Sequence, residues 1–178
     1  MSGICYLNNA AVAADWLARR LGRVAILDID VHHGNGTQSI FFERADVLYV
    51  SVHIDPAVGP PYYAGYADEV GEGPGRGFNL NMPLPWGTQD AAFLGSVDRG
   101  IAAIKAFEPT ALIVSLGLDA SEHESAPTFR VTDEGFRATA QRLSRLGLPI
   151  LLVQEGGYLN PHLGATLGAV LSSFDPTP

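Results

Sequence analysis

The stretch ILDIDVHHGNG, residues 26–36, places side chains capable of chemistry directly after an apolar run. Asp28, Asp30 and His32 alternate with apolar residues, so on an extended strand they point to one face. On such a strand Asp28 and His32 lie about 13 Å apart, too far to share one ion, whereas Asp30 and His32 lie about 6.6 Å apart. This spacing predicts a zinc ion held by Asp30 and His32. Asp28 is left to orient a neighbour or to hold a second, harder cation.

A third zinc ligand must come from elsewhere in the chain, and Asp119, at the end of ALIVSLGLD, is the best placed candidate. Two carboxylates and a neutral imidazole cancel the charge of a dication and leave a coordination position open for water, as a catalytic site requires. In the alternative interpretation the acids only cap loops and the histidines pack in the core. Because unpaired buried acids are costly, we favour the metal site.

Tyr158 follows two glycines, Gly156 and Gly157, which allow a tight turn and a close approach of the backbone to a ligand. A phenol with an ordinary pKa of about 10 is protonated at neutral pH, so it can donate a hydrogen bond to a developing oxyanion. A packing role is the alternative for this residue.

Strands of Val, Ile and Leu alternate with helical segments, a pattern that predicts an α/β fold with a parallel sheet flanked by helices. In such sheets, ligands bind at the carboxyl ends of the strands, where the polar residues of this chain gather. Asn8 or Asn9, Thr88 and Thr132 are the expected helix caps. The first helix is expected to bury Val12, Trp16, Leu17 and Leu21 and to stop at Gly22, and residues 55–77 to form a long ordered loop. The expected strands are 24–30, 47–54, 111–119 and 148–157, and the other expected helices are 36–46, 88–107, 132–147 and 160–174.

Composition narrows the classes of function. The formal charge of −8 repels nucleic acid and favours cationic ligands. The single cysteine, Cys5, excludes an internal disulfide, and we expect a reducing, cytoplasmic setting. No apolar segment reaches the length of about 18 residues that a membrane span needs.

The blocks SGICYLNNAAVAA, ILDIDVHHGNGTQ, VSVH, SLGLDASEHE and QEGGY, in this order and spacing, resemble the histone deacetylase superfamily. The segments around YYAGYADEVGEGPGRG and LGLDASEHESAPTFRVT are similar to its bacterial acetylpolyamine amidohydrolase branch, which includes histone deacetylase-like amidohydrolases. The resemblance implies an arginase-like fold and zinc-dependent removal of acetyl groups from a small cationic acetylated amine or acetyl-lysine. It also allows a homo-oligomer, because dimerisation narrows the substrate channel in that branch.

The resemblance also implies roles for individual residues. Asp30, His32 and Asp119 match zinc ligands, and Tyr158 matches the tyrosine that polarises the substrate carbonyl. Asn35 stands where many relatives carry an aspartate. Glu122 and Glu124 could face an ammonium group, although a solvated loop is favoured for both. Two monovalent-cation sites are implied, a structural potassium site at Asp28, Asp30, His32, Ser51 and Val52 and a peripheral one at the carbonyls of Phe41, Arg44 and Val47.

In the family, a Pro-Gly-His-His-Ala segment supplies the general base and acid shortly before the block that begins here with MSGICYLNN. The sequence does not contain that segment, and His33, which follows ligand His32, is expected to pack on the other face. His53 and His162 are expected in core or surface roles, and nothing around His123 marks it as a base. We therefore interpret residues 1–178 as the C-terminal portion of a histone deacetylase-like catalytic domain, lacking the family's N-terminal portion and with impaired activity.

Three alternatives remain open from the sequence. A haloacid dehalogenase-type phosphatase would use Asp28 as nucleophile and magnesium as cofactor, but it leaves the EGGY and LGLD blocks without a role. A binuclear manganese ureohydrolase needs further His and Asp ligands. The third alternative is a non-catalytic remnant that keeps the fold and the ion.

Overall fold

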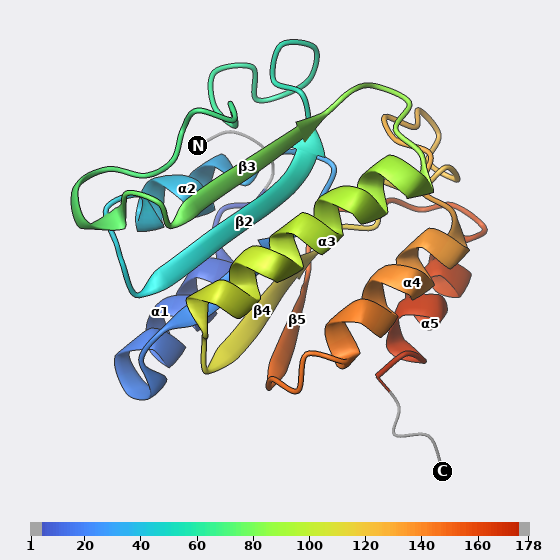
Figure 1. Ribbon diagram of the computed structural model, residues 1–178. Helices are drawn as coiled ribbons and strands as arrows, with labels where there is room; N and C mark the ends of the chain where they lie inside the picture. The colour runs from blue at the N-terminus through green and yellow to red at the C-terminus, as the bar shows by residue number, and fades with distance from the viewer. Residues whose placement is uncertain (1–4, 175–178) are drawn as a thin grey trace.

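Five parallel strands form the framework that positions the candidate residues (Figure 1). The computed structural model describes residues 5–174. In space the strands follow the order β3-β2-β1-β4-β5, so the first strand lies at the centre. The strands are β1 (Val24–Asp28), β2 (Val47–Ile54), β3 (Asn79–Leu84), β4 (Ala111–Leu116) and β5 (Ile150–Gln154). The helices are α1 (Asn9–Leu21), α2 (Asn35–Phe41), α3 (Asp90–Phe107), α4 (Asp133–Ser144) and α5 (Leu163–Leu171), with a 3-10 turn at Gly73–Gly75.

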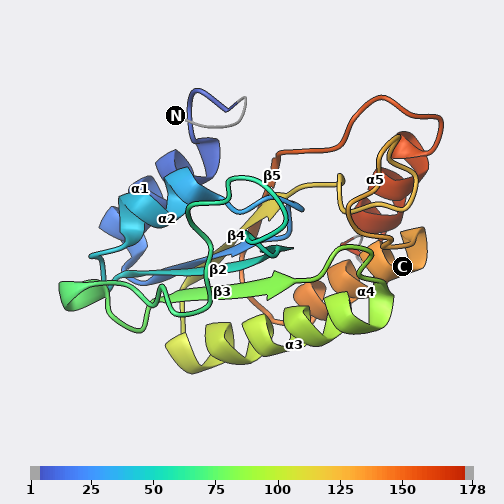
Figure 2. The ribbon, with the colours of Figure 1, turned by 90° about the horizontal axis from the view of Figure 1, so that it is seen from above.

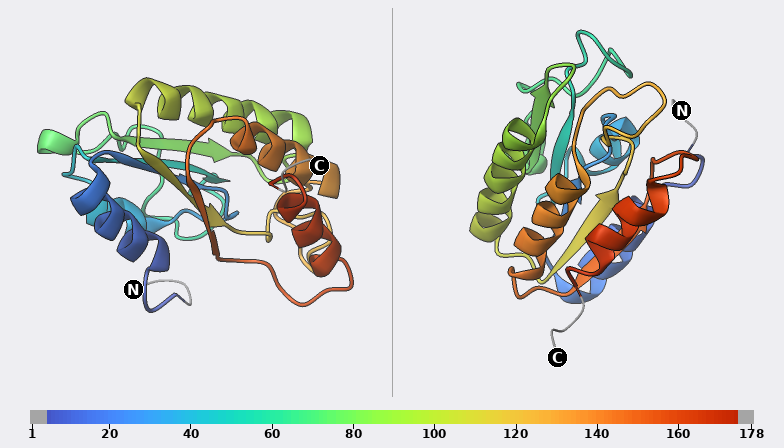
Figure 3. Two further views of the ribbon diagram at one scale, coloured as in Figure 1. Left: turned by 90° about the horizontal axis from the view of Figure 1, so that it is seen from below. Right: turned by 90° about the vertical axis from the view of Figure 1, so that its right-hand side faces the viewer.

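Helices cover both faces of the sheet, as the view from above shows (Figure 2). One face packs against α1 and α2, and the other against α3 and α4, with α5 beside α4 at the β5 end (Figure 3). Both faces of β1, β2 and β4 are therefore buried, which explains their continuous Val, Ile and Leu runs. The predicted α/β class with a helix-flanked parallel sheet is confirmed.

The sheet register brings the polar strand ends to one edge. Asp28, the last residue of β1, lies opposite Ser51 on one side and Ser115 on the other. Because all five strands are parallel, the residues that follow β1, β4 and β5 emerge at the same edge of the sheet. The motifs around Asp30, Asp119 and Tyr158 thus become neighbours despite their separation in sequence.

Two of the predicted helix caps are confirmed and one is wrong. The Asn8 side chain accepts a hydrogen bond from the Ala11 amide at 2.8 Å, and Thr132 caps α4 through the Gly135 amide. Thr88 does not cap α3, since its hydroxyl donates to the Pro85 carbonyl and Gln89 occupies the cap position.

The predicted buried stripe of α1 is wrong. Val12, Trp16 and Leu21 are exposed, and of the four expected residues only Leu17 packs against the core. The buried face consists of the small residues Ala10, Ala11, Ala14 and Ala18. Alanine side chains allow the helix axis to lie close to β1 and β4, where larger side chains would not fit.

The strand β3 was missed by the sequence analysis, which assigned only four strands. Its sequence, NLNMPL, carries asparagines and a proline, residues that are depleted in strands. Proline is tolerated here because β3 lies at the edge of the sheet, where one side of the backbone needs no partner strand. The long loop predicted at 55–77 is confirmed apart from its 3-10 turn. Within residues 5–174, no helix combines the length and apolar character needed to cross a membrane.

Candidate metal centre

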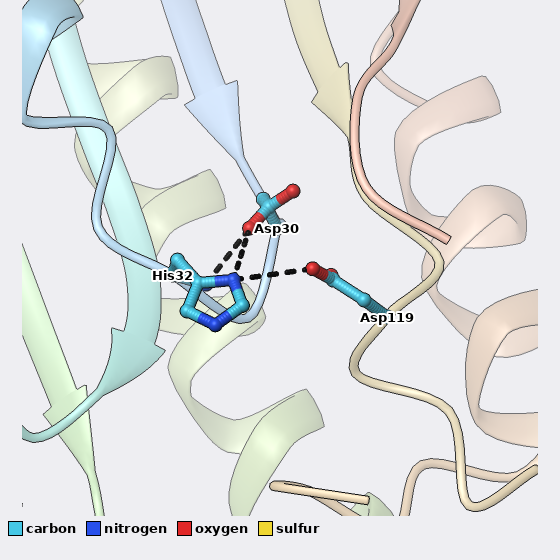
Figure 4. A group of neighbouring side chains, drawn as sticks. All are labelled: Asp30, His32 and Asp119. Atoms are coloured by element: carbon cyan, nitrogen blue, oxygen red, sulfur yellow. Dashed lines mark hydrogen bonds and ion pairs between the residues drawn. The ribbon is translucent and has the colours of Figure 1, made fainter. Parts of the chain in front are cut away.

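Asp30, His32 and Asp119 come together at the carboxyl edge of the sheet, between the ends of β1 and β4 (Figure 4). The His32 Nδ1 atom lies 3.3 Å from Asp30 Oδ1 and 3.2 Å from Asp119 Oδ2. One ligand atom from each residue lies within 4.8 Å of the others. Asp119 is buried, whereas the imidazole of His32 is partly open to solvent.

The local backbone that joins Asp30 to His32 differs from the expected strand. β1 ends at Asp28, and Asp30 and His32 lie in the turn that follows it. The Asp30 Oδ1 atom accepts a hydrogen bond from the His32 amide at 2.8 Å, which folds the imidazole back toward its own carboxylate neighbour. The two ligands thus converge through a turn rather than through the alternation of side chains along a strand.

Backbone amides fix both carboxylates. Asp30 Oδ2 accepts from the Gly156 amide at 2.9 Å, and Asp119 Oδ1 accepts from the Val31 amide at 3.0 Å. Gly156 must be a glycine for this packing, since a Cβ atom there would lie 2.3 Å from Asp119 Oδ2 and 2.6 Å from Asp30 Oδ2. The first glycine of the EGGY block therefore lets the backbone approach the two carboxylates themselves, in addition to the tight turn expected before Tyr158.

The electrostatics of the cluster are those of a cation site. The neighbouring carboxylates, Asp119 first and then Asp30, raise the pKa of His32 to about 10. Burial raises the pKa of Asp119, an effect that its contact with His32 partly offsets. Asp119 Oδ2 is buried and makes no hydrogen bond with protein atoms, although it faces His32 Nδ1. A buried carboxylate oxygen with this geometry is suited to a metal ion.

The two separations between His32 and the carboxylates are those of a tetrahedral zinc site. In a tetrahedral site with bonds of about 2.0 Å, neighbouring ligand atoms lie about 3.3 Å apart. His32 Nδ1 lies at 3.2 and 3.3 Å from the two carboxylate oxygens, and all three ligand atoms lie within 4.8 Å of one another. Two anionic oxygens and one imidazole nitrogen are ordinary zinc ligands, and they leave a fourth position available.

Asp28 stands apart from this cluster. It is buried and accepts hydrogen bonds from the Tyr49 hydroxyl at 2.9 Å and from the Asp30 amide at 3.2 Å. Burial and the charge of Asp30 raise its pKa well above the ordinary value. The bond to the Asp30 backbone is consistent with the first role predicted for Asp28, orienting a neighbour, and both predicted roles stay predictions. Tyr49 was missed by the sequence analysis, because a partner from an adjacent strand leaves no local sequence signal.

The residues of the two predicted monovalent-cation sites lie as follows. Asp28 and Ser51 face each other across β1 and β2, and Val52 follows on β2. The second set surrounds the turn between α2 and β2, where the Phe41 carbonyl accepts from the Arg44 amide at 2.9 Å and Val47 begins the strand. Both cation assignments stay predictions.

Tyr158 lies in the loop between β5 and α5, with its side chain about half exposed. Burial, followed by the negative charges of Asp119, Asp30 and Glu124, raises its pKa. The phenol is therefore protonated at neutral pH and available as a hydrogen-bond donor beside the cluster.

The remaining histidines are accounted for by packing. His33 is buried, bonds Gln38 through Nε2 at 3.0 Å and packs against His53, which is also buried. This confirms that His33 points away from the metal cluster. His162 lies on the surface and stacks on His123.

Fold and site together define an α/β protein with a candidate metal centre at the carboxyl edge of a parallel sheet. A family profile described as the histone deacetylase domain matches residues 1–174. The chain therefore belongs to the histone deacetylase domain family. Within residues 5–174, the cluster of Asp30, His32 and Asp119 is the one group of three His, Cys, Asp or Glu side chains close enough to share an ion.

Curated and solved relatives agree with this family assignment. The chain is 46% identical over 176 residues to acetylpolyamine amidohydrolase 2 of Pseudomonas aeruginosa, a match that covers 98% of this chain and 51% of that protein. It is 45% identical over 172 residues to an acetylpolyamine amidohydrolase of Burkholderia pseudomallei, covering 97% of this chain and 50% of the relative. The crystal structure of acetylpolyamine aminohydrolase from Burkholderia pseudomallei superposes with a TM-score of 0.95 at 45% identity, over 98% of this chain and 51% of that one. The chain thus spans about half the length of the curated relatives it matches.

Proposed function

We propose that this chain carries the zinc-binding part of a deacetylase site that removes acetyl groups from acetylated amines. The observation that supports it most is the spacing of the His32, Asp30 and Asp119 ligand atoms, at 3.2 and 3.3 Å, in a member of the histone deacetylase domain family. The names of the relatives favour an acetylated polyamine, and acetyl-lysine is the alternative substrate. The formal charge of −8 is consistent with a cationic amine.

In this proposal each residue has a defined task. Asp30, His32 and Asp119 hold the zinc ion, which when bound would polarise the acetyl carbonyl and activate a water molecule. Tyr158 donates a hydrogen bond to the carbonyl oxygen as negative charge develops there. The amides of Gly156 and Val31 keep the carboxylates in place, so the ligand geometry needs little reorganisation.

The proposal includes a structural potassium ion at Asp28, Asp30, His32, Ser51 and Val52. It is supported by the opposition of Asp28 and Ser51 across β1 and β2 and by the burial of both residues. The peripheral cation at the Phe41, Arg44 and Val47 carbonyls belongs to the proposal by resemblance alone. A reducing, cytoplasmic setting is also part of it, supported by the single cysteine.

The proton transfers are assigned by resemblance to two adjacent histidines in a segment that the 178 residues do not contain. We therefore expect residues 1–178, as the C-terminal portion of the catalytic domain, to bind zinc but to release acetate slowly when tested alone. Zinc binding without acetate release would favour the non-catalytic alternative for this polypeptide.

The test combines metal counting with an acetate assay. Zinc stoichiometry is measured by elemental analysis after dialysis, with about one zinc per chain expected and none retained by Asp119→Ala or His32→Ala. Acetate release from N-acetylputrescine and from an acetyl-lysine peptide is then measured with added zinc. The proposal fails if zinc binding does not depend on these two residues, or if any acetate release survives Asp119→Ala unchanged.

A further inference from the structure

The loop that carries Tyr158, residues 155–162, is held in place by the loop that carries Asp119. The Tyr158 amide donates a hydrogen bond to Glu124 Oε1 at 3.1 Å. Near the start of the loop, the Leu118 amide donates to the Gly156 carbonyl at 2.8 Å. The position of Tyr158 therefore depends on Leu118 and Glu124, which flank Asp119 and lie more than 30 positions before Tyr158 in the sequence.

A second contact fixes the far end of the same loop. The rings of His123 and His162 stack at 4.0 Å between centroids with an interplanar angle of 14°. Between the two contacts, Asn160 accepts from the His162 amide at 2.8 Å and donates to the Tyr158 carbonyl at 3.0 Å. Contacts with neighbouring residues 123 and 124 thus hold positions 158 and 162.

The Tyr158 side chain receives little support from packing. It is about half exposed, and the preceding Gly157 adopts a φ of +119°, a conformation that other residues rarely adopt. Loops of this kind open locally at low cost unless specific contacts restrain them. Among the described residues, the Glu124 carboxylate is the side chain that accepts the hydrogen bond of the Tyr158 amide, whereas Asn160 bonds the Tyr158 carbonyl from within the same loop.

We propose that Glu124 is a positioning residue that sets the place of Tyr158 beside the metal centre by binding its backbone amide. This inference rests on the proposed function, in which the Tyr158 phenol must meet a carbonyl oxygen bound next to zinc. Glu124 does not belong to the metal cluster of Asp30, His32 and Asp119. Glu124 lies in the loop after Asp119, as expected from sequence, and its carboxylate has a partner there in the Tyr158 amide.

The first experiment measures the hydrogen bond itself. Amide hydrogen exchange at Tyr158 is followed by NMR in the wild-type chain, Glu124→Ala and Glu124→Gln. The alanine variant lacks the acceptor, so exchange at Tyr158 is expected to accelerate at least about fivefold. Glutamine keeps a carbonyl oxygen in the same place and should stay within about twofold of wild type. Glu122→Ala, which changes a neighbouring exposed carboxylate, serves as the matched control.

The second experiment tests whether Glu124 acts through the Tyr158 hydroxyl. Acetohydroxamate, a small zinc chelator with a carbonyl oxygen, is titrated into the zinc-loaded wild-type chain, Tyr158→Phe, Glu124→Ala and the double variant. We expect each single variant to bind the probe about tenfold more weakly, and the double variant to bind no more weakly than Tyr158→Phe. Zinc affinity should stay within about twofold of wild type in Glu124→Ala, since no metal ligand is touched.

The outcomes separate this inference from the proposed function. If the wild-type chain binds no zinc, the proposed function fails, and amide exchange still decides whether Glu124 holds Tyr158. Unchanged exchange at Tyr158 in Glu124→Ala overturns the inference. An additive loss of probe affinity in the double variant also overturns it, because Glu124 would then act independently of the phenol.

Discussion

Replacing Gly156 by alanine is the sharpest test of the metal centre. The added Cβ would lie 2.3 Å from Asp119 Oδ2 and 2.6 Å from Asp30 Oδ2, whereas ordinary contact begins at 3.4 Å. The carboxylate oxygens would therefore have to move by about 1 Å, and metal ligands tolerate displacements of only about 0.2 Å. Changes in residues that merely orient ligands weaken metal binding by about 10- to 100-fold. Because this change displaces two ligands directly, we expect zinc affinity to fall at least about 100-fold.

The assay is competition for zinc with a chromophoric chelator, with circular dichroism to confirm that the variant is folded. Gly164→Ala is the matched control, because nothing lies within 4 Å of a Cβ at this position of α5. Its zinc affinity should equal that of the wild-type chain. If folded Gly156→Ala binds zinc within about threefold of wild type, the assignment of Asp30 and Asp119 as joint ligands is refuted.

Three further predictions concern protonation and packing. Because contacts with Asp119 and Asp30 raise the pKa of His32 to about 10, zinc must displace a proton from this side chain when it binds. Calorimetry of zinc binding in two buffers should detect the release of about one proton. If no proton is released, His32 is not held protonated by the two carboxylates. Burial lowers the pKa of His53 to about 4, below the unfolded value of about 6.5, so its contribution to stability is present above pH 6.5 and lost as the pH falls toward 4. The wild-type chain should therefore lose stability relative to His53→Gln across this window in urea unfolding, and parallel pH profiles would exclude the shift. Ala14→Leu should lower the free energy of unfolding by about 1–3 kcal/mol, because the larger side chain overpacks against the sheet. Trp16→Gln changes an exposed residue and should lower it by less than about 1 kcal/mol. Equal losses of stability in the two variants would contradict the observed orientation of α1.

The ligand types were predictable from sequence because their chemistry is local. A short polar motif following a buried apolar run indicates a strand end, and parallel strands bring such ends to one edge. This reasoning brought Asp119 to Asp30 and His32 although about 90 positions separate them. The detailed geometry was not predictable, since the chain turns after Asp28 and brings the His32 imidazole back to Asp30 through a backbone hydrogen bond.

The sequence was less informative where neighbouring elements decide the outcome. Hydropathy favoured Val12 and Trp16 as the buried face of α1, whereas the sheet accepts the alanine face because it allows closer approach. The β3 sequence lacks the usual strand composition and is recruited by pairing with β2 at the edge of the sheet. In both cases, packing against neighbouring elements contributes more free energy than the intrinsic preference of the segment for another buried face or another conformation.

By itself, the sequence determined the class of fold through hydrophobic periodicity and the kinds of side chain at the centre through residue chemistry, and its motif blocks resembled the family that the profile match shows. The tertiary structure alone decided which backbone groups hold those side chains. Gly156 approaches two carboxylates, Tyr49 binds Asp28, and Glu124 binds the Tyr158 amide. The physical reason is that hydrogen bonds and close packing act over only a few ångströms. They join residues that are far apart in the sequence, and the sequence does not show which of these residues meet.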